Sequence, residues 1–388
     1  MKNLFKLFLA ALLVTALATI WPAQLRAGSD KGAPEIVTNN DVKGQNTVSF
    51  FKFTGTALKG PSSGDTLGNG IGGGFAGLER IALGGTKQVT CGFVSDAGSS
   101  DITVFKVVNK VVNKVVTIVG KFSDAQGSGK THGIGLAVAG NYLLAGFTTS
   151  KNIGAWQIQS DCTLTFLANF TTPYAIAGMR VAPNGKTLIV GYGSGVNKVD
   201  SFSLATTGLT EHGPYPATAG AAGVDITKDS AYAIFGDTTR SKTHVEIYPI
   251  RANGTLGKRT DFGGTLGDGK GSSNVWLSVD EKFLFVSNNS SKQVTSLAFS
   301  ESPLSLSYIN ITTVNNASKI SSVAGLKTVL TTGSGGFLVL TEDASPESFV
   351  ALLQINADGS TTEVSGSPFS TGFGPGLQSL LVGPPRPF

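Results

Sequence analysis

Short runs of apolar and polar residues alternate along most of the chain. Runs rich in Val, Ile, Leu, Phe and Thr are separated by clusters of Gly, Asn, Asp, Ser and Pro. β-branched and aromatic residues favour strands, and the separating residues favour turns. No window of 12 or more residues keeps the spacing of an amphipathic helix. The pattern therefore predicts an all-β protein.

One hairpin pattern recurs along the chain, at intervals typical of repeat folds. It consists of an apolar strand, a small residue, Asn or Asp, a polar turn and a second alternating strand. With its variants it occurs seven times, at Val37–Val48, Val94–Phe105, Gly146–Ile153, Val190–Val199, Phe235–Val245, Val286–Leu297 and Leu340–Phe349. One strand precedes each hairpin and one follows it. Each unit thus has four antiparallel strands, about one β-propeller blade.

These units predict a seven-bladed β-propeller. Six blades begin near residues 77, 131, 174, 220, 271 and 317. The seventh is divided between the chain ends: Gly374–Val382 has the pattern of an inner strand, whereas Glu35–Val37, Thr47–Phe53 and a stretch near Leu58 resemble a blade that lacks one. We expect these N- and C-terminal strands to pair and close the ring, because closure protects the sheet edges.

The first 27 residues have the features of a signal peptide. Lys2 and Lys6 precede the apolar run Leu7–Ile20, and Leu25-Arg26-Ala27 offers a cleavage site, with an earlier one after Ala18 as an alternative. The run is short for a bilayer span, so we expect cleavage rather than an uncleaved anchor. This predicts a single propeller domain over residues 28–388, extracytoplasmic (secreted or periplasmic), monomeric and without a membrane span.

Charge and cysteine content refine this picture. The net charge is +5, but three basic residues belong to the leader, so the mature chain carries only +2 and has no cluster of Lys and Arg. We therefore expect no nucleic-acid partner. A disulfide between Cys91 and Cys162 is chemically possible in an exported protein. We favour free, buried thiols, because the pattern places the two residues on different blades at different radial depths.

Several of these motifs resemble the YVTN-type repeats of the lactonase-like propeller family, which includes 6-phosphogluconolactonase. The resemblance rests on Phe285–Asn289, Val181–Lys186 and the segment Ala357–Phe369, and extends over about residues 35–382. It implies a propeller fold and, as one activity, lactone hydrolysis. No catalytic motif of the family matches residue by residue, and a shared fold does not fix function.

Histidine is scarce, and only His132 is a catalytic candidate. It lies just before a predicted inner strand, where a neutral imidazole could act as a general base; a loop residue without catalytic duty is the alternative. His212 and His244 are expected to be structural. Three dispersed histidines suggest no metal site, and we expect no cofactor.

Asp96 and Asp237 in hairpin turns could ligate a cation, although turn hydrogen bonds explain them as well.

Alignment of the inner strands brings Arg180 and Asp225 to the same height on neighbouring blades, with Trp276 at the equivalent position of the next blade. Opposite charges placed there should pair, because either one buried alone would be costly. These residues predict a polar binding patch for an anionic or hydroxylated ligand, with Trp276 as an apolar wall. A purely structural ion pair is the alternative.

Two familiar motifs are discounted. Gly68–Gly73 fits a dinucleotide fingerprint, which needs a helix after it, and is expected to connect two blades. Gly60–Gly64 fits a nucleophile elbow, which also needs a helix, and is expected to be a Ser/Gly loop.

Two functions remain open. The first is a binding or interaction module for a small molecule or protein at the channel face. The alternative is a lactone (carboxylic ester) hydrolase that uses His132 and Arg180. If the protein is a lactonase, export favours an extracytoplasmic lactone over phosphorylated sugar lactones, which are intracellular. The sequence does not decide between the two functions.

Overall fold

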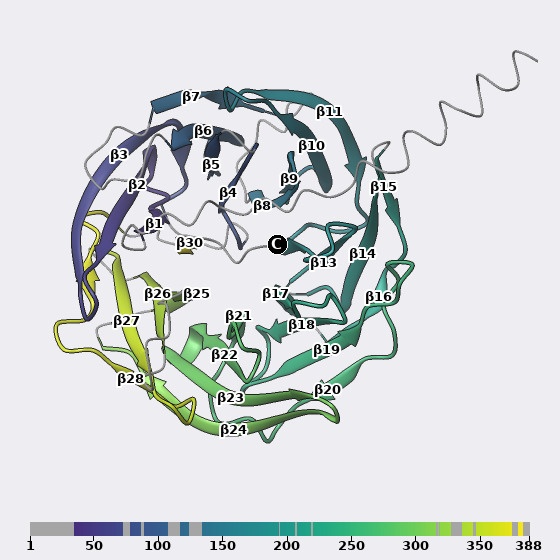
Figure 1. Cartoon of the computed structure of the whole chain (residues 1–388), viewed down its shortest axis with the longest axis vertical. Coiled ribbons are helices and arrows are strands. Elements are labelled where there is room, and N and C mark those ends of the chain that lie inside the picture. Colours follow the sequence, from purple (N-terminus) through teal and green to yellow (C-terminus); the bar gives the residue numbers. More distant parts are fainter. Residues whose placement is uncertain are drawn as a thin grey trace, which may run out of the picture.

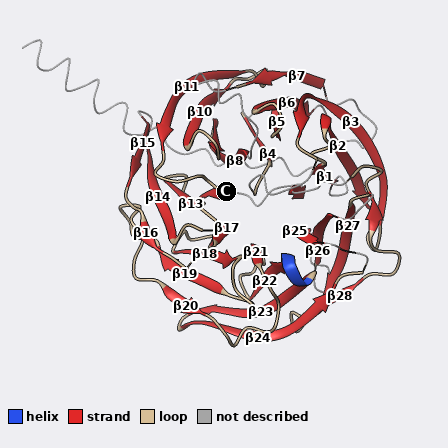
Figure 2. Ribbon diagram, turned by 180° about the vertical axis from the view of Figure 1, so that it is seen from behind, coloured by secondary structure: helices blue, strands red, loops and turns tan. Residues whose placement is uncertain are grey.

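Seven antiparallel sheets are arranged radially around a central axis (Figure 1). The computed structural model describes residues 35–72, 78–86, 89–107, 117–123, 134–193, 195–205, 208–218, 220–315, 317, 319–326, 336–343, 347–374 and 379–382. Nearly all of the regular structure in these ranges is strand, as Figure 2 shows, apart from the short 3-10 helix η1 (Asn289–Ser291). The predicted all-β, seven-bladed propeller is confirmed. None of the described helical residues forms a helix long and apolar enough to cross a membrane.

The blades are numbered here from the one that contains both chain ends, and their strands are given from the axis outwards. Blade 1 consists of β30 (Ser379–Val382), β1 (Glu35–Asn39), β2 (Gly44–Phe53) and β3 (Leu58–Gly70). Blade 2 consists of β4 (Ile81–Gly85), β5 (Thr90–Asp96), β6 (Asp101–Val107) and β7 (Thr117–Phe122), and blade 3 of β8 (Ile134–Ala139), β9 (Tyr142–Phe147), β10 (Asn152–Ile158) and β11 (Leu164–Thr171). Blade 4 consists of β12 (Gly178–Val181), β13 (Thr187–Gly191), β14 (Lys198–Ala205), β15 (Gly208–Glu211) and the short β16 (Tyr215–Pro216).

The remaining blades repeat this order. Blade 5 consists of β17 (Ala221–Ile226), β18 (Tyr232–Asp237), β19 (Val245–Pro249) and β20 (Thr260–Phe262), and blade 6 of β21 (Ser272–Leu277), β22 (Phe283–Asn288), β23 (Gln293–Glu301) and β24 (Leu304–Thr313). Blade 7 consists of β25 (Lys319–Leu326), β26 (Phe337–Asp343), β27 (Phe349–Ile355), β28 (Thr361–Glu363) and the short β29 (Phe369–Ser370).

The two ends of the chain share blade 1, as the sequence predicts. β30 pairs with β1 in antiparallel register, from Ile36 opposite Val382 to Asn39 opposite Ser379. β1 pairs on its other side with β2. The last described strand therefore supplies the inner strand that the N-terminal part of the chain lacks, and the ring is closed by backbone hydrogen bonds.

The hydrophobic core is divided among the boundaries between blades. A cluster of buried apolar side chains lies at each of the seven boundaries between described sheets. Both faces of a middle strand therefore meet a neighbouring blade, which is why Thr187–Gly191 in β13 is buried at every position. Strands buried on both faces read as continuous apolar runs rather than alternating ones.

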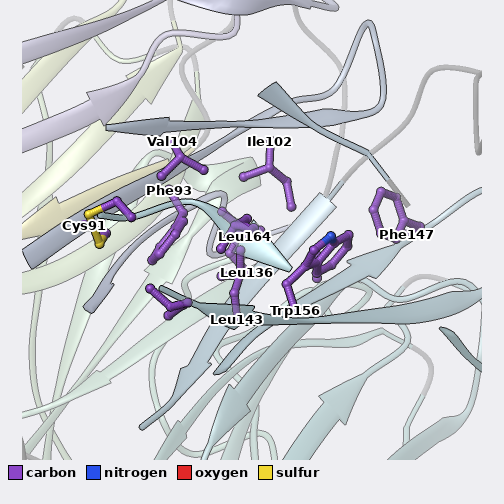
Figure 3. Close-up of a cluster of buried hydrophobic side chains, with 12 residues drawn as sticks. Cys91, Phe93, Ile102, Val104, Leu136, Leu143, Phe147, Trp156 and Leu164 are labelled. Atoms are coloured by element: carbon purple, nitrogen blue, oxygen red, sulfur yellow. A yellow bond between two sulfur atoms is a disulfide. The ribbon is translucent and has the colours of Figure 1, made fainter. Parts of the chain in front are cut away.

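The expectation of free cysteines is wrong. Cys91 of β5 and Cys162, in the turn between β10 and β11, form a disulfide that joins blades 2 and 3. Their Cα atoms lie 5.6 Å apart. Cys162 adopts a left-handed conformation, with φ of +72°, and its turn reaches over the boundary to β5. Figure 3 shows Cys91 beside Phe93 in the cluster between these blades.

The interpretation of Gly60–Gly64 as a Ser/Gly loop is also wrong. The segment belongs to β3, where Ser62 and Ser63 pair with Phe50 and Ser49 of β2. β3 is the outer strand of blade 1, and most of Leu58–Gly64 is exposed. An outer strand has no apolar face to bury against a further strand, so its composition resembles that of a loop. Neither glycine motif is followed by a helix among the described residues.

Candidate functional site

Arg180 of β12 and Asp225 of β17 form the predicted ion pair across the boundary between blades 4 and 5. Arg180 Nη1 donates to Asp225 Oδ1 at 2.7 Å. Asp225 is buried and also accepts two backbone hydrogen bonds, from Ile226 N at 2.9 Å and from Leu277 N at 2.7 Å. Its carboxylate therefore ties together the inner strands of blades 4, 5 and 6, so its direct duty is structural.

The side chain of Arg180 is partly exposed. Its side chain is 31% exposed, against 1% for that of Asp225. Burial opposes its charge, but the neighbouring carboxyl groups of Asp225 and Glu79 outweigh burial and raise the pKa of Arg180. The residue is thus a permanently charged donor, held in one orientation by a buried carboxylate, and part of its side chain faces solvent.

Glu79, which was not predicted as a site residue from the sequence, lies beside this ion pair. Its Oε1 lies 4.0 Å from Nη2 of Arg180, and its side chain is only 12% exposed. Burial raises the pKa of Glu79 to about 7, although Arg180 acts in the opposite direction. A carboxyl group with this pKa exchanges its proton near neutral pH, which is the property required of a general acid or base.

The backbone around Glu79 is fixed by contacts with three blades. Leu78 N donates to Ala177 O at 2.7 Å, and the carbonyl oxygen of Glu79 accepts from Leu136 N at 2.8 Å. Leu78 also packs with Ala177 and Ala222 in a small buried cluster. Glu79 itself adopts φ of +52°, which is uncommon for a residue other than glycine. These contacts hold its carboxyl group beside β12.

A second buried ion pair anchors the other end of this segment. Arg80 Nη2 donates to Asp41 Oδ1 at 2.7 Å, and both side chains are fully buried. Arg80 O accepts from Ser95 N at 3.0 Å. The adjacent charges Glu79 and Arg80 therefore have different partners. Arg80 pairs with Asp41 at the boundary between blades 1 and 2, whereas Glu79 faces Arg180. Two charges directly before an apolar run, in a chain with few charges, were the signal available in the sequence.

The other predicted site residues do not join this group. Trp276 stacks on Phe285, with ring centroids 5.8 Å apart, and lies against Gly325 of the next blade. It packs against the cluster between blades 6 and 7. The hydrogen bond to Asp225 comes instead from the backbone N–H of the next residue, Leu277. His132 lies outside the described residues, so its role stays a prediction.

The remaining two histidines are engaged in hydrogen bonds within blades 4 and 5. His212 Nε2 lies 2.6 Å from Ser203 Oγ, and His244 Nε2 lies 2.8 Å from Asp261 Oδ1. Glu79, Arg180 and Asp225 therefore form the candidate site, with Asp225 as the positioning residue.

Comparison with solved structures places this architecture among known propellers. A periplasmic gluconolactonase from Pseudomonas aeruginosa superposes with a TM-score of 0.69 at 14% identity, over 90% of this chain and 99% of that one. A proposed 6-phosphogluconolactonase from Bacteroides fragilis gives 0.70 at 13% identity, over 92% and 99%. The chain has the fold of the lactonase-like propellers.

This likeness is one of fold. A hypothetical selenium-binding protein from Sulfolobus tokodaii superposes almost as well, with a TM-score of 0.67 at 8% identity over 92% of this chain and 95% of that one. No known family profile and no curated protein matches the sequence. The lactonase-like propeller fold is therefore shared by proteins with different descriptions, and function has to be argued from the site.

Proposed function

We propose that this propeller is a lactone hydrolase that acts at Glu79 and Arg180. The observation that carries the proposal is a buried carboxyl group with a pKa of about 7, held 4.0 Å from the guanidinium of a partly exposed arginine side chain. A base with that pKa is matched to neutral pH. A fixed positive charge stabilises the negative charge that develops on a carbonyl oxygen under attack. Hydrolysis of a lactone needs both functions.

The reaction follows from these two roles. The Glu79 carboxylate takes a proton from a water molecule, whose oxygen attacks the carbonyl carbon of the lactone. Arg180 stabilises the resulting oxyanion. When the tetrahedral intermediate collapses, the ring C–O bond breaks and the proton held by Glu79 passes to the departing alkoxide. The product is an open-chain hydroxy acid, and Glu79 returns to its ionised form.

The charges of the site favour an uncharged lactone. Two carboxyl groups, those of Glu79 and Asp225, face one guanidinium. With Glu79 ionised, these three groups carry a net charge of −1, so a dianionic phosphate would be repelled more strongly than an uncharged lactone. Export supports the same conclusion, because sugar phosphates are intracellular. We therefore place unphosphorylated sugar lactones first among substrates.

A panel of lactones tests the proposal with the mature protein. We expect Glu79→Gln to lower kcat by about 10²- to 10⁴-fold, the usual contribution of a general base. Arg180→Ala should lower it by about 10²- to 10³-fold, as the loss of an oxyanion donor does. Asp268→Asn, at a side chain that is 89% exposed, is the matched control and should have wild-type activity. Circular dichroism verifies that each variant is folded.

The kinetic pH profile provides a second readout. The base must be ionised to act, so kcat/KM should rise with pH to a plateau, with its midpoint near 7. Full activity in the Glu79→Gln variant would exclude Glu79 as the base. No turnover of any lactone by the folded wild-type protein would exclude the hydrolase.

The low exposure of Glu79, 12%, favours a second candidate function: a binding propeller whose ligand contacts Arg180 without turnover. The ligand could be a small hydroxylated molecule or a protein segment that presents such groups. Calorimetry with lactones and their hydroxy acids distinguishes the two functions. Binding without hydrolysis, lost in Arg180→Ala and kept in Asp268→Asn, would establish the binding module.

Export is supported by two independent features. The first 27 residues resemble a signal peptide, and the Cys91–Cys162 disulfide is of the kind that persists in oxidising compartments. Mass spectrometry of protein recovered from periplasm or medium should find an N-terminus near Gly28. Recovery of the uncleaved chain from the cytoplasm alone would refute export.

A further inference from the structure

A second group of titratable side chains is buried in blade 5 and shares no residue with the Glu79–Arg180 site. It consists of Asp237 at the end of β18, His244 just before β19, and Glu246 within β19. One nitrogen or oxygen from each side chain lies within 4.8 Å of the others. Asp237 and Glu246 are fully buried, and His244 is 5% exposed. Hairpin pairing brings them together, since Asp237 N donates to His244 O at 3.2 Å.

The imidazole of His244 has one committed nitrogen and one without a hydrogen bond. Nε2 lies 2.8 Å from Asp261 Oδ1. A carboxylate can only accept, so Nε2 carries a proton. Nδ1 is buried and makes no hydrogen bond, although it lies 3.5 Å from Asp237 Oδ2. A bare nitrogen lone pair facing a carboxylate in a buried site is unfavourable unless a positive charge lies between them.

The carboxylate oxygens of this group accept several hydrogen bonds, among them from Thr239 N to Asp237 Oδ1 at 2.8 Å and from Tyr248 Oη to Glu246 Oε2 at 2.9 Å. The hydroxyl of Thr218 lies 2.5 Å from Asp237 Oδ2 and also contacts Glu246 Oε1. It has one proton and can donate to only one of the two carboxylates. A second oxygen–oxygen contact therefore has no hydrogen to bridge it. A cation between these oxygens and the unpartnered Nδ1 of His244 would satisfy both contacts.

The charged residues around the group leave one negative charge unbalanced. Arg240 Nε lies 3.2 Å from Asp237 Oδ2, and Arg259 Nη1 lies 3.0 Å from Glu246 Oε1. The side chains of both arginines reach solvent, with 51% and 31% exposure. Together with Asp261 there are three carboxylates against two guanidinium groups, so the group is one positive charge short of neutrality when His244 is uncharged.

We propose that Asp237, His244 and Glu246 bind a divalent transition-metal ion of the zinc class. Imidazole with carboxylates is a common zinc ligand set, whereas calcium and magnesium prefer oxygen alone. A metal-bound histidine usually donates its other nitrogen to a carboxylate, which is the role of Asp261 here. Thr218 precedes β17, so its hydroxyl or a water molecule would complete the coordination where blade 4 leads into blade 5.

Zinc binding tests this site directly. The mature chain, made without a histidine tag, is treated with a chelator, loaded with Zn²⁺ and desalted, and its metal is measured by elemental analysis. We expect one equivalent per chain, a higher melting temperature with Zn²⁺, and the loss of both in His244→Ala. His212→Ala is the matched control, because it removes a histidine hydrogen-bonded in blade 4, and it should keep both.

Asp261→Asn separates metal binding from folding. It retains the three proposed ligands and changes only the carboxylate behind His244, so it should weaken zinc affinity by about 10- to 100-fold without loss of the fold. The proposal is overturned if the folded wild-type chain retains no zinc, which would mean that a second proton on His244 supplies the missing charge. Equal affinity in wild type and His244→Ala would overturn it as well.

Discussion

Glu79 is expected to couple the stability of the protein to pH. Burial raises its pKa from 4.5 to about 7. Between these values the folded state holds a proton that the unfolded chain has released, so the contribution of Glu79 to the free energy of unfolding falls as pH rises from about 4.5 to 7. Glu79→Gln removes this dependence. Its stability relative to wild type should therefore increase by up to about 3 kcal/mol from pH 5 to pH 8.

Urea denaturation of both proteins across this pH range measures the difference. Asp96 and Asp200 also have pKa values raised by burial, to about 6 and about 7, so the wild-type stability itself will not isolate Glu79. Both residues are present in the variant, and their contributions cancel on subtraction. Parallel stability curves for the two proteins would mean that Glu79 has an ordinary pKa.

Single residues differ in how far the sequence could predict them. Arg180 and Asp225 were found because inner strands repeat at one register, so equal positions in two repeats lie side by side. Glu79 precedes β4 in a connecting segment that lacks the repeat pattern. Its contacts come from other blades, which only the closed ring places next to it. His244 and Asp237 are seven residues apart in the chain, a spacing that matches no common metal motif, and only the hairpin makes them neighbours.

Packing between strands of adjacent blades makes Gly325 of β25 intolerant of a side chain. A Cβ atom there would overlap the indole ring of Trp276, which is held against Phe285. Gly325→Ala should therefore destabilise the protein by about 1–3 kcal/mol, as overpacking of a core does. Chemical denaturation followed by tryptophan fluorescence measures the loss. Gly64→Ala is the control, since its nearest neighbour is Val48 Cγ2 at 4.0 Å; equal stability of the two variants would contradict this packing.

The link between β5 and the β10–β11 turn gives a further prediction. The Cys91–Cys162 disulfide closes a loop across 71 positions of sequence. In the chain-entropy description, a loop of this length contributes about 4 kcal/mol to stability. The Cys91→Ala/Cys162→Ala double variant should lose up to that amount in urea denaturation. Thiol titration of the denatured, unreduced protein should find no free thiol, and two free thiols would show that the link does not form.

Strands were more predictable than the segments that connect them. The hairpins from Val37–Val48 to Leu340–Phe349 were found because middle strands are buried on both faces and must be apolar. The Gly60–Gly64 part of β3 was predicted to be a loop because an outer strand carries the composition of a loop. The disulfide was not predicted because the left-handed conformation of Cys162 directs its turn across the blade boundary to Cys91. Sequence patterns do not encode this conformation.

Closure of the ring depends on one short strand, β30. It supplies the inner strand of blade 1 through its pairing with β1, from Ile36–Val382 to Asn39–Ser379. Removal of residues 379–388 would leave β1 with an unpaired edge facing the axis, and an unpaired edge is a site of aggregation. A terminal strand tied into a sheet is not expendable in the way that a frayed end is.

We therefore expect the chain that ends at residue 378 to lose cooperative thermal unfolding and to aggregate, whereas a chain that ends at Val382 keeps the closing pairs and the wild-type transition. Differential scanning calorimetry and size-exclusion chromatography compare the two. A synthetic peptide of residues 374–388, added during refolding of the shorter chain, should restore the transition because it offers the missing strand to β1. If the shorter chain melts like its control, β30 does not hold the ring closed, and the geometry inferred for the inner strands, including the place of Glu79 beside Arg180, would have to be revised.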